Sequence, residues 1–215
     1  MSAFEFFFSF YGLLLGLSVA VIATGLASSI QHRRRIRFGW KTPMLALFVA
    51  LDIASFWDSA WTNFQHLPFS YGLLVVGLAI ALVYFIAASL VFPHEIEDGL
   101  NLDDHFWANK KVVLLLLVAA NTLGLLAAVP ANLARPHGDF LLINYAVAIS
   151  LYYALIIPAA LARKATLFAV TIGLHIVIYI FFAVITPLQA LVGEGGQVNL
   201  PEAPAAGLPR DAAGE

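Results

Sequence analysis

The stretch VVLLLLVAANTLGLLAAVPANL, residues 112–133, contains no Lys, Arg, Asp or Glu. A helix needs about 20 consecutive apolar residues to cross the hydrocarbon core of a bilayer, and this stretch is long enough. Its apolar run is continuous rather than alternating, which favours a helix over a strand of a β-barrel. With five further runs of this kind, the sequence predicts an all-α bundle of six transmembrane helices, at about 4–30, 42–64, 70–92, 112–133, 140–162 and 165–192.

The composition supports a membrane domain. Only 11% of the 215 residues are charged and 61% are hydrophobic, whereas soluble domains carry about 25% charged residues. We expect one transmembrane domain over 1–192 and a flexible tail over 193–215, because the tail is rich in Pro, Gly and Ala and has no apolar period. The formal net charge of -2 gives no sign of a nucleic-acid partner.

The basic residues predict the orientation. All of the 11 Lys and Arg residues except Arg135 and Arg210 lie in or beside the first, third and fifth loops. The positive-inside rule places these loops in the cytoplasm, so both termini and the tail lie outside it. The densest group could also bind anionic lipid headgroups or a partner protein at the cytoplasmic face; it consists of Arg33, Arg34, Arg35 and Arg37.

The third loop is acidic and ends in a predicted helix start. Asn101 is followed three residues later by Asp104, a pattern typical of an N-cap with an acidic residue in the first turn. We expect a short helix over 102–111 that lies along the cytoplasmic interface and runs into the fourth span, with Phe106 and Trp107 toward lipid and Asp103 toward water.

Weak internal similarity suggests a repeat. SFYGLL at 9–14 resembles FSYGLL at 69–74. Each even-numbered helix has a lysine near its cytoplasmic end and a polar residue eleven positions later, about 16 Å along the axis: Lys41 and Asp52, Lys110 and Asn121, and Lys164 and His175. These features predict three tandem two-helix hairpins in parallel orientation.

Asp52 is the sharpest candidate for function. A carboxylate in mid-bilayer costs about 2.5–3.5 kcal/mol on insertion scales, and no Lys or Arg lies at that depth in the predicted helices. Asp52 is therefore expected to be protonated, hydrogen-bonded or in contact with water. If the hairpins surround one axis, Asp52, Asn121 and His175 meet in a midplane polar site, with Ser55 and Tyr84 beside them. Helix-to-helix hydrogen bonding is the structural alternative for these groups.

No catalytic constellation is visible, so we do not expect an enzyme. HExxH, nucleophile-elbow and phosphate-loop patterns are absent. The chain has no cysteine, which excludes thiolate metal sites and thiol catalysis. His175 is the one histidine in a helix core and cannot supply the paired ligands of a bundle haem. We therefore expect neither a metal nor a cofactor.

Three segments together resemble a known family. They are YGLLLGL at 11–17, HRRRIRFGW at 32–40 and LDIASFW at 51–57, and LVFP at 90–93 and DDHFW at 103–107 fit as well. In these segments the chain is similar to a family of small, uncharacterised bacterial proteins of the inner membrane. The resemblance implies the multi-pass topology and a bacterial inner-membrane location, and it carries over no activity or site.

Two functions remain open from the sequence. The first is a small channel or transporter for protons or a small cation, with the midplane polar site at its centre. The second is a non-catalytic membrane subunit or scaffold that binds partner proteins through its cytoplasmic loops. Beyond the lipid bilayer, the sequence leaves open whether the partner is a second copy of the chain or another membrane protein.

Overall fold

The computed structural model describes residues 3–64, 70–133 and 138–195. In these segments it has six helices and an isolated bridge between two loops. The helices are α1 (Ala3–Gln31), α2 (Lys41–Phe64), α3 (Tyr71–Ser89), α4 (Leu102–Leu133), α5 (Gly138–Leu161) and α6 (Ala165–Gly195). Most of the predicted tail, from residue 196 onward, lies outside the described residues.

Five of the helices are long and apolar enough to cross a membrane: α1, α2, α3, α4 and α6. The described apolar part of α5, Tyr145–Leu161, is shorter than a full span. The described part of the chain is thus all-helical, with six helices, and is that of a membrane protein. The sixth crossing, the hairpin repeat and the sides of the termini stay predictions.

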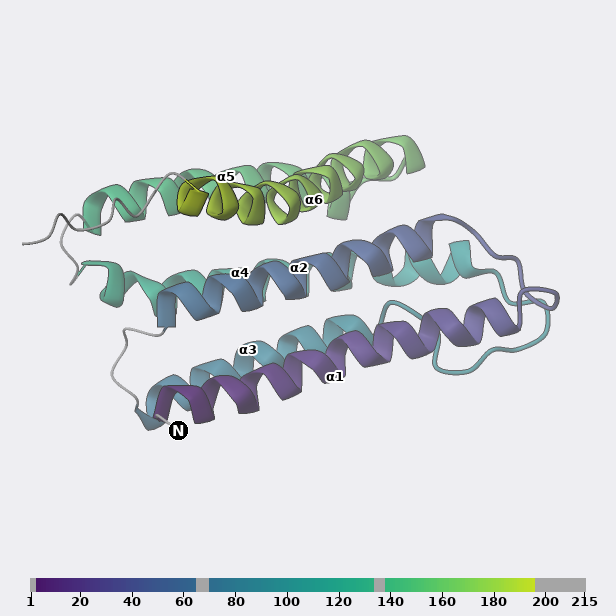
Figure 1. Ribbon diagram of the computed structural model, residues 1–215. Helices are drawn as coiled ribbons and strands as arrows, with labels where there is room; N and C mark the ends of the chain where they lie inside the picture. Colours follow the sequence, from purple (N-terminus) through teal and green to yellow (C-terminus); the bar gives the residue numbers. More distant parts are fainter. Residues whose placement is uncertain (1–2, 65–69, 134–137, 196–215) are drawn as a thin grey trace, which may run out of the picture. The chain divides into compact units, whose positions relative to one another are not determined.

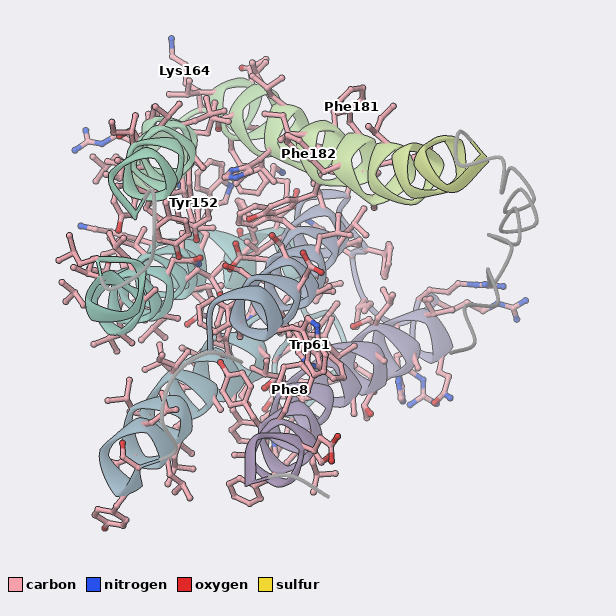
Figure 2. All side chains as sticks on the ribbon, turned by 60° about the vertical axis from the view of Figure 1, so that its left-hand side comes forward. Phe8, Trp61, Tyr152, Lys164, Phe181 and Phe182 are labelled. Carbon is pink, nitrogen blue, oxygen red and sulfur yellow. The ribbon has the colours of Figure 1, made fainter. Side chains whose placement is uncertain are left out.

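The chain divides into two units, Met1–Ile180 and Phe181–Glu215, and the first contains α1 to α5 and the first half of α6. Within it α1 packs on α3 and α2 packs on α4, and Figure 1 shows both pairs side by side. Helix α4 also contacts α3 and α5. At one end of the α1–α2 contact, Phe8 and Trp61 lie against each other with ring centroids 4.8 Å apart (Figure 2).

Helix α4 begins ten residues before the predicted span, at Leu102, and runs on without a break. Asn101 caps it as expected, because its Oδ1 accepts from the backbone N–H of Asp103 at 3.1 Å. The expectation that Phe106 faces lipid is wrong. Its ring is 1% exposed and packs edge-on against Phe168 of α6 at 4.7 Å. Tertiary packing thus makes the first turns of α4 part of the bundle.

The first and third loops bind each other. The backbone N–H of Arg37 donates to Leu100 O at 2.9 Å, and the N–H of Gly99 donates to Arg35 O at 2.9 Å. Lys41 forms an ion pair with Asp103. We call this pairing of 35–41 with 98–103 the loop clasp. The four arginines predicted to bind lipid headgroups or a partner remain exposed, namely Arg33, Arg34, Arg35 and Arg37. The guanidinium of Arg35 lies 3.7 Å from the carboxylate of Asp98.

Lys110 does not lie at the start of α4, as the repeat suggested, but two turns inside it. Its side chain is buried, and its Nζ donates to the backbone oxygens of Ala159 at 3.0 Å and Ala160 at 3.2 Å, and to that of Ala162. Ala159 and Ala160 belong to the last turn of α5, where carbonyls lack the usual N–H partner four residues on, although Ala159 O also accepts from the N–H of Ala162 at 3.3 Å. A cation there also complements the negative end of the helix dipole, so Lys110 fixes the end of α5 against α4.

Candidate functional site

Asp52 lies in the core of the first unit, with 1% of its surface exposed. The hydroxyl of Tyr179 donates to its Oδ1 at 2.7 Å. On the other oxygen, Oδ2 accepts from the Tyr84 hydroxyl at 3.0 Å and from Asn121 Nδ2 at 3.2 Å. Both carboxyl oxygens therefore have hydrogen-bond donors, which offsets much of the cost of burying a carboxylate.

Asn121 connects the carboxyl group to α5. Besides Asp52, its Nδ2 lies 3.1 Å from the Tyr84 hydroxyl, 3.0 Å from the Tyr152 hydroxyl and 3.1 Å from Leu117 O. An amide nitrogen has only two hydrogens, so these four acceptors compete for two donors. Tyr152 points from α5 into the bundle (Figure 2). We call Asp52, Tyr84, Asn121, Tyr152 and Tyr179 the Asp52 cluster.

The local packing explains why α2 and α4 bring Asp52 and Asn121 together. A Cβ on Gly124 would lie 2.5 Å from the ring of Phe56, so only a glycine there lets the two helices approach this closely. Phe56 in turn packs on Tyr84, with ring centroids 5.2 Å apart. Tyr84 is completely buried, and this contact holds its hydroxyl on the carboxyl group.

His175 lies beside this cluster rather than in it. Its ring packs on Phe48, Tyr152 and Tyr179 at centroid distances of 5.1, 5.1 and 5.0 Å. Its Nδ1 is buried without a hydrogen-bond partner. The direct Asp–His pair suggested by the equal lysine spacings is therefore not formed. Phe48 lies one turn before Asp52 on α2, and Tyr179, one turn after His175 on α6, is the residue that reaches Asp52.

Two predicted site residues remain, Tyr84 and Ser55. Tyr84 lies in the centre of the cluster and donates to Asp52. Ser55 lies on the exposed surface of α2 and interacts with the Tyr179 hydroxyl. Whether the five predicted residues form a transport site stays a prediction, although the structure joins Asp52, Asn121 and Tyr84 directly.

Tyr179 is the residue that sequence reasoning missed, although it makes the shortest bond to Asp52. One signal was present: Tyr179 follows His175 by four residues, so both lie on one face of α6. A tyrosine among apolar neighbours looks like an interfacial anchor until a partner is known. Its role depends on how α6 is rotated toward α2.

The charges around the site limit its chemistry. In residues 3–64, 70–133 and 138–195 the ion pairs join Arg35 to Asp98 and Lys41 to Asp103, so none involves Asp52. The same segments contain no group of three His, Cys, Asp or Glu residues that could hold a metal ion. The partners of Asp52 in the described residues are thus neutral hydrogen-bonding groups, namely two tyrosine hydroxyls and an amide.

Comparison with known proteins adds no further evidence: no protein-family model, curated protein or solved structure matches this chain.

Proposed function

We propose that this protein is a small channel or transporter that carries protons across the bacterial inner membrane, with Asp52 as the group that binds the transported proton. The observation that carries the proposal is a carboxyl group that is 1% exposed inside a membrane-spanning helix and held by tyrosine hydroxyls and an amide. Ionisable residues inside membrane spans commonly mark ion or proton pathways.

The donors around Asp52 favour a proton over a small cation. Na⁺ and the divalent cations need several oxygens directed at the ion. Here Tyr179 and Tyr84 direct O–H groups at the carboxyl oxygens, and Asn121 directs N–H. A proton can be accepted without moving the tyrosine oxygens, because a hydroxyl that donates to a carboxylate can turn its hydrogen away and accept from the protonated acid.

The test is proton flux into liposomes that contain the purified protein and an internal pH-sensitive dye. A potassium gradient with valinomycin supplies the driving force. We expect wild-type flux to exceed that of protein-free liposomes, and Asp52→Asn, which removes the titrating group, to lower it at least about tenfold, equivalent to about 1.4 kcal/mol. Asp58→Asn is the matched control, because Asp58 is exposed on α2.

Wild-type flux at the level of protein-free liposomes, or an Asp52→Asn variant that transports as fast as the wild type, would leave Asp52 with a structural role. Loss of flux in Asp58→Asn as well would show that the assay reports net charge rather than the site.

The second candidate is a membrane subunit or scaffold that binds partners, or anionic lipids, through its cytoplasmic loops. The loop clasp gives it a specific surface, because the exposed Arg35 and Arg37 belong to the clasp and the exposed Arg33 and Arg34 directly precede it. The clasp also pairs two acidic residues of the third loop, Asp98 and Asp103, with basic residues of the same chain. If this candidate is right, the wild-type protein shows only background proton flux. The double variant Arg33→Ala with Arg34→Ala then loses binding to vesicles that contain phosphatidylserine, or to a purified membrane partner.

A further inference from the structure

We propose that protons reach Asp52 from one end of the bundle only, where α2 ends and α5 begins, along hydroxyl groups that α2, α4 and α5 hold between them. The route rests on the proposed proton transport, and it adds the direction of access and the residues that provide it. We call these residues the hydroxyl path: Ser55, Ser59, Thr122, Tyr145 and Tyr153.

The path starts at the carboxyl group and follows one face of α2. Asp52, Ser55 and Ser59 are three and four residues apart, so they lie above one another. Ser55 interacts with the Tyr179 hydroxyl, which donates to Asp52. One turn further along α2, Ser59 interacts with the half-buried Tyr145 of α5.

A second pair continues the path on α4 and α5. The hydroxyl of Thr122 donates to Val118 O at 2.6 Å and lies 2.7 Å from the Tyr153 hydroxyl. Since the hydrogen of Thr122 is already used, Tyr153 is the donor in this pair. Thr122 follows Asn121 directly, and Tyr153 follows Tyr152, so the pair borders the Asp52 cluster. All five path residues are half-buried or exposed, whereas Asp52 is 1% exposed.

The other end of the bundle is closed by apolar side chains. From Asp52 toward the start of α2, the inner layer is formed by residues that are each at most 1% exposed: Leu45, Phe48, Val49, Leu114, Leu117, Ile156, Phe168 and Ile172. Beyond this layer the buried cation of Lys110 is already bound to the end of α5.

The polar groups in or beside this layer do not extend the path. Thr171 donates to carbonyls of its own helix, Leu167 O at 2.8 Å and Phe168 O at 3.2 Å, and Thr42 donates to Leu102 O at 3.1 Å. Neither bonds to a second hydroxyl in the described residues, as Thr122 does to that of Tyr153. His175 Nδ1 has no hydrogen-bond partner. A proton crosses protein along hydrogen-bonding groups or water, and an apolar layer at membrane depth offers neither. The two halves of the bundle therefore differ in access: hydroxyls lead to one end, and close-packed hydrocarbon separates Asp52 from the other.

Cysteine accessibility tests this directly, because the native chain has no cysteine. The single variants Ser59→Cys, Ser55→Cys and Val49→Cys are made in liposomes of known orientation, with Arg34→Cys marking the α1–α2 loop. A charged, membrane-impermeant methanethiosulfonate is added to one side at a time.

The matched control is Ser150→Cys. Ser150 lies on α5 at about the depth of Ser55 and is exposed, but its neighbours Val147 and Leu151 are 65% and 49% exposed. Such an apolar face meets lipid in the membrane, so a cysteine there has no water in which to ionise and react. Because Ser55 and Ser150 lie at about the same depth in the bilayer, a difference between the labelling rates of their cysteine variants reports access to water.

We expect Ser59→Cys and Ser55→Cys to react from the side opposite to Arg34→Cys. Val49→Cys and Ser150→Cys should react at least about tenfold more slowly, and the modified Ser59→Cys protein should lose most of its proton flux. Reaction of Val49→Cys as fast as Ser59→Cys, or labelling of Ser59→Cys from the Arg34 side, overturns the one-sided route. Wild-type flux with an unreactive Ser59→Cys overturns the route alone, whereas absence of wild-type flux overturns proton transport as well.

Discussion

Replacing Tyr179 by phenylalanine removes one hydroxyl and keeps the aromatic ring. The ring packs on Phe48 and His175, and these contacts survive the change. What is lost is the 2.7 Å hydrogen bond to Asp52 Oδ1. That oxygen is buried, so no bulk water replaces the donor, and the change isolates one bond of the Asp52 cluster.

The size of the effect follows from the charge and burial of the acceptor. Hydrogen bonds to charged groups contribute about 1.5–3 kcal/mol, whereas side-chain hydrogen bonds in membrane bundles average about 0.6 kcal/mol and reach about 1.7 kcal/mol. Because Asp52 keeps the Tyr84 and Asn121 donors, we expect Tyr179→Phe to lower the free energy of unfolding by about 1–2 kcal/mol.

The measurement is reversible unfolding of the purified protein in mixed micelles by sodium dodecyl sulfate, followed by circular dichroism. Tyr71→Phe is the control, because its side chain is 81% exposed and its loss should change stability by less than about 0.5 kcal/mol. A double-mutant cycle with Asp52→Asn assigns the loss to the pair. A Tyr179→Phe variant as stable as the wild type, with no coupling to Asp52, would show that this hydrogen bond does not stabilise the fold.

Two further substitutions test contacts that hold α4 in place, measured by the same unfolding in sodium dodecyl sulfate. Lys110→Ala removes the ammonium group that binds three carbonyls at the end of α5 and should cost about 2 kcal/mol, whereas Lys111→Ala, at an exposed position, should be neutral; equal losses would argue against the cap. Gly39→Ala places a Cβ 1.9 Å from Asp103 Oδ1 and should cost about 1–3 kcal/mol. Gly16→Ala has nothing within 4 Å of the added Cβ and should not destabilise, so matching losses would contradict the clash.

Some features of the site could be read from the sequence because they are local. Asp52 stood out through its desolvation cost, which depends only on its place within an apolar run. Asn101 was recognisable as a helix cap because capping involves residues within one turn. Tyr84 and Asn121 were candidates for the same reason as Asp52, being polar residues far from the ends of apolar segments.

Other features depended on contacts between segments far apart in the chain. The pairing of Arg37 with Leu100 joins loops more than sixty residues apart, and nothing in either loop shows that they meet. Phe106 was expected in lipid and packs on Phe168 instead. The lysine spacings pointed to His175 at the level of Asp52, but the rotation and shift of α6 place Tyr179 there.

Three features of this protein can be derived from its amino-acid sequence alone: the chain is helical, most of its helices are long enough to cross a membrane, and Asp52 needs partners. The physical reason is that backbone hydrogen bonding in lipid and the cost of burying charge act on each segment separately. Which partners Asp52 has depends on how the helices pack, because lipid-exposed faces and helix contacts are equally apolar in sequence. Close approach at small residues such as Gly124 then selects the faces that meet.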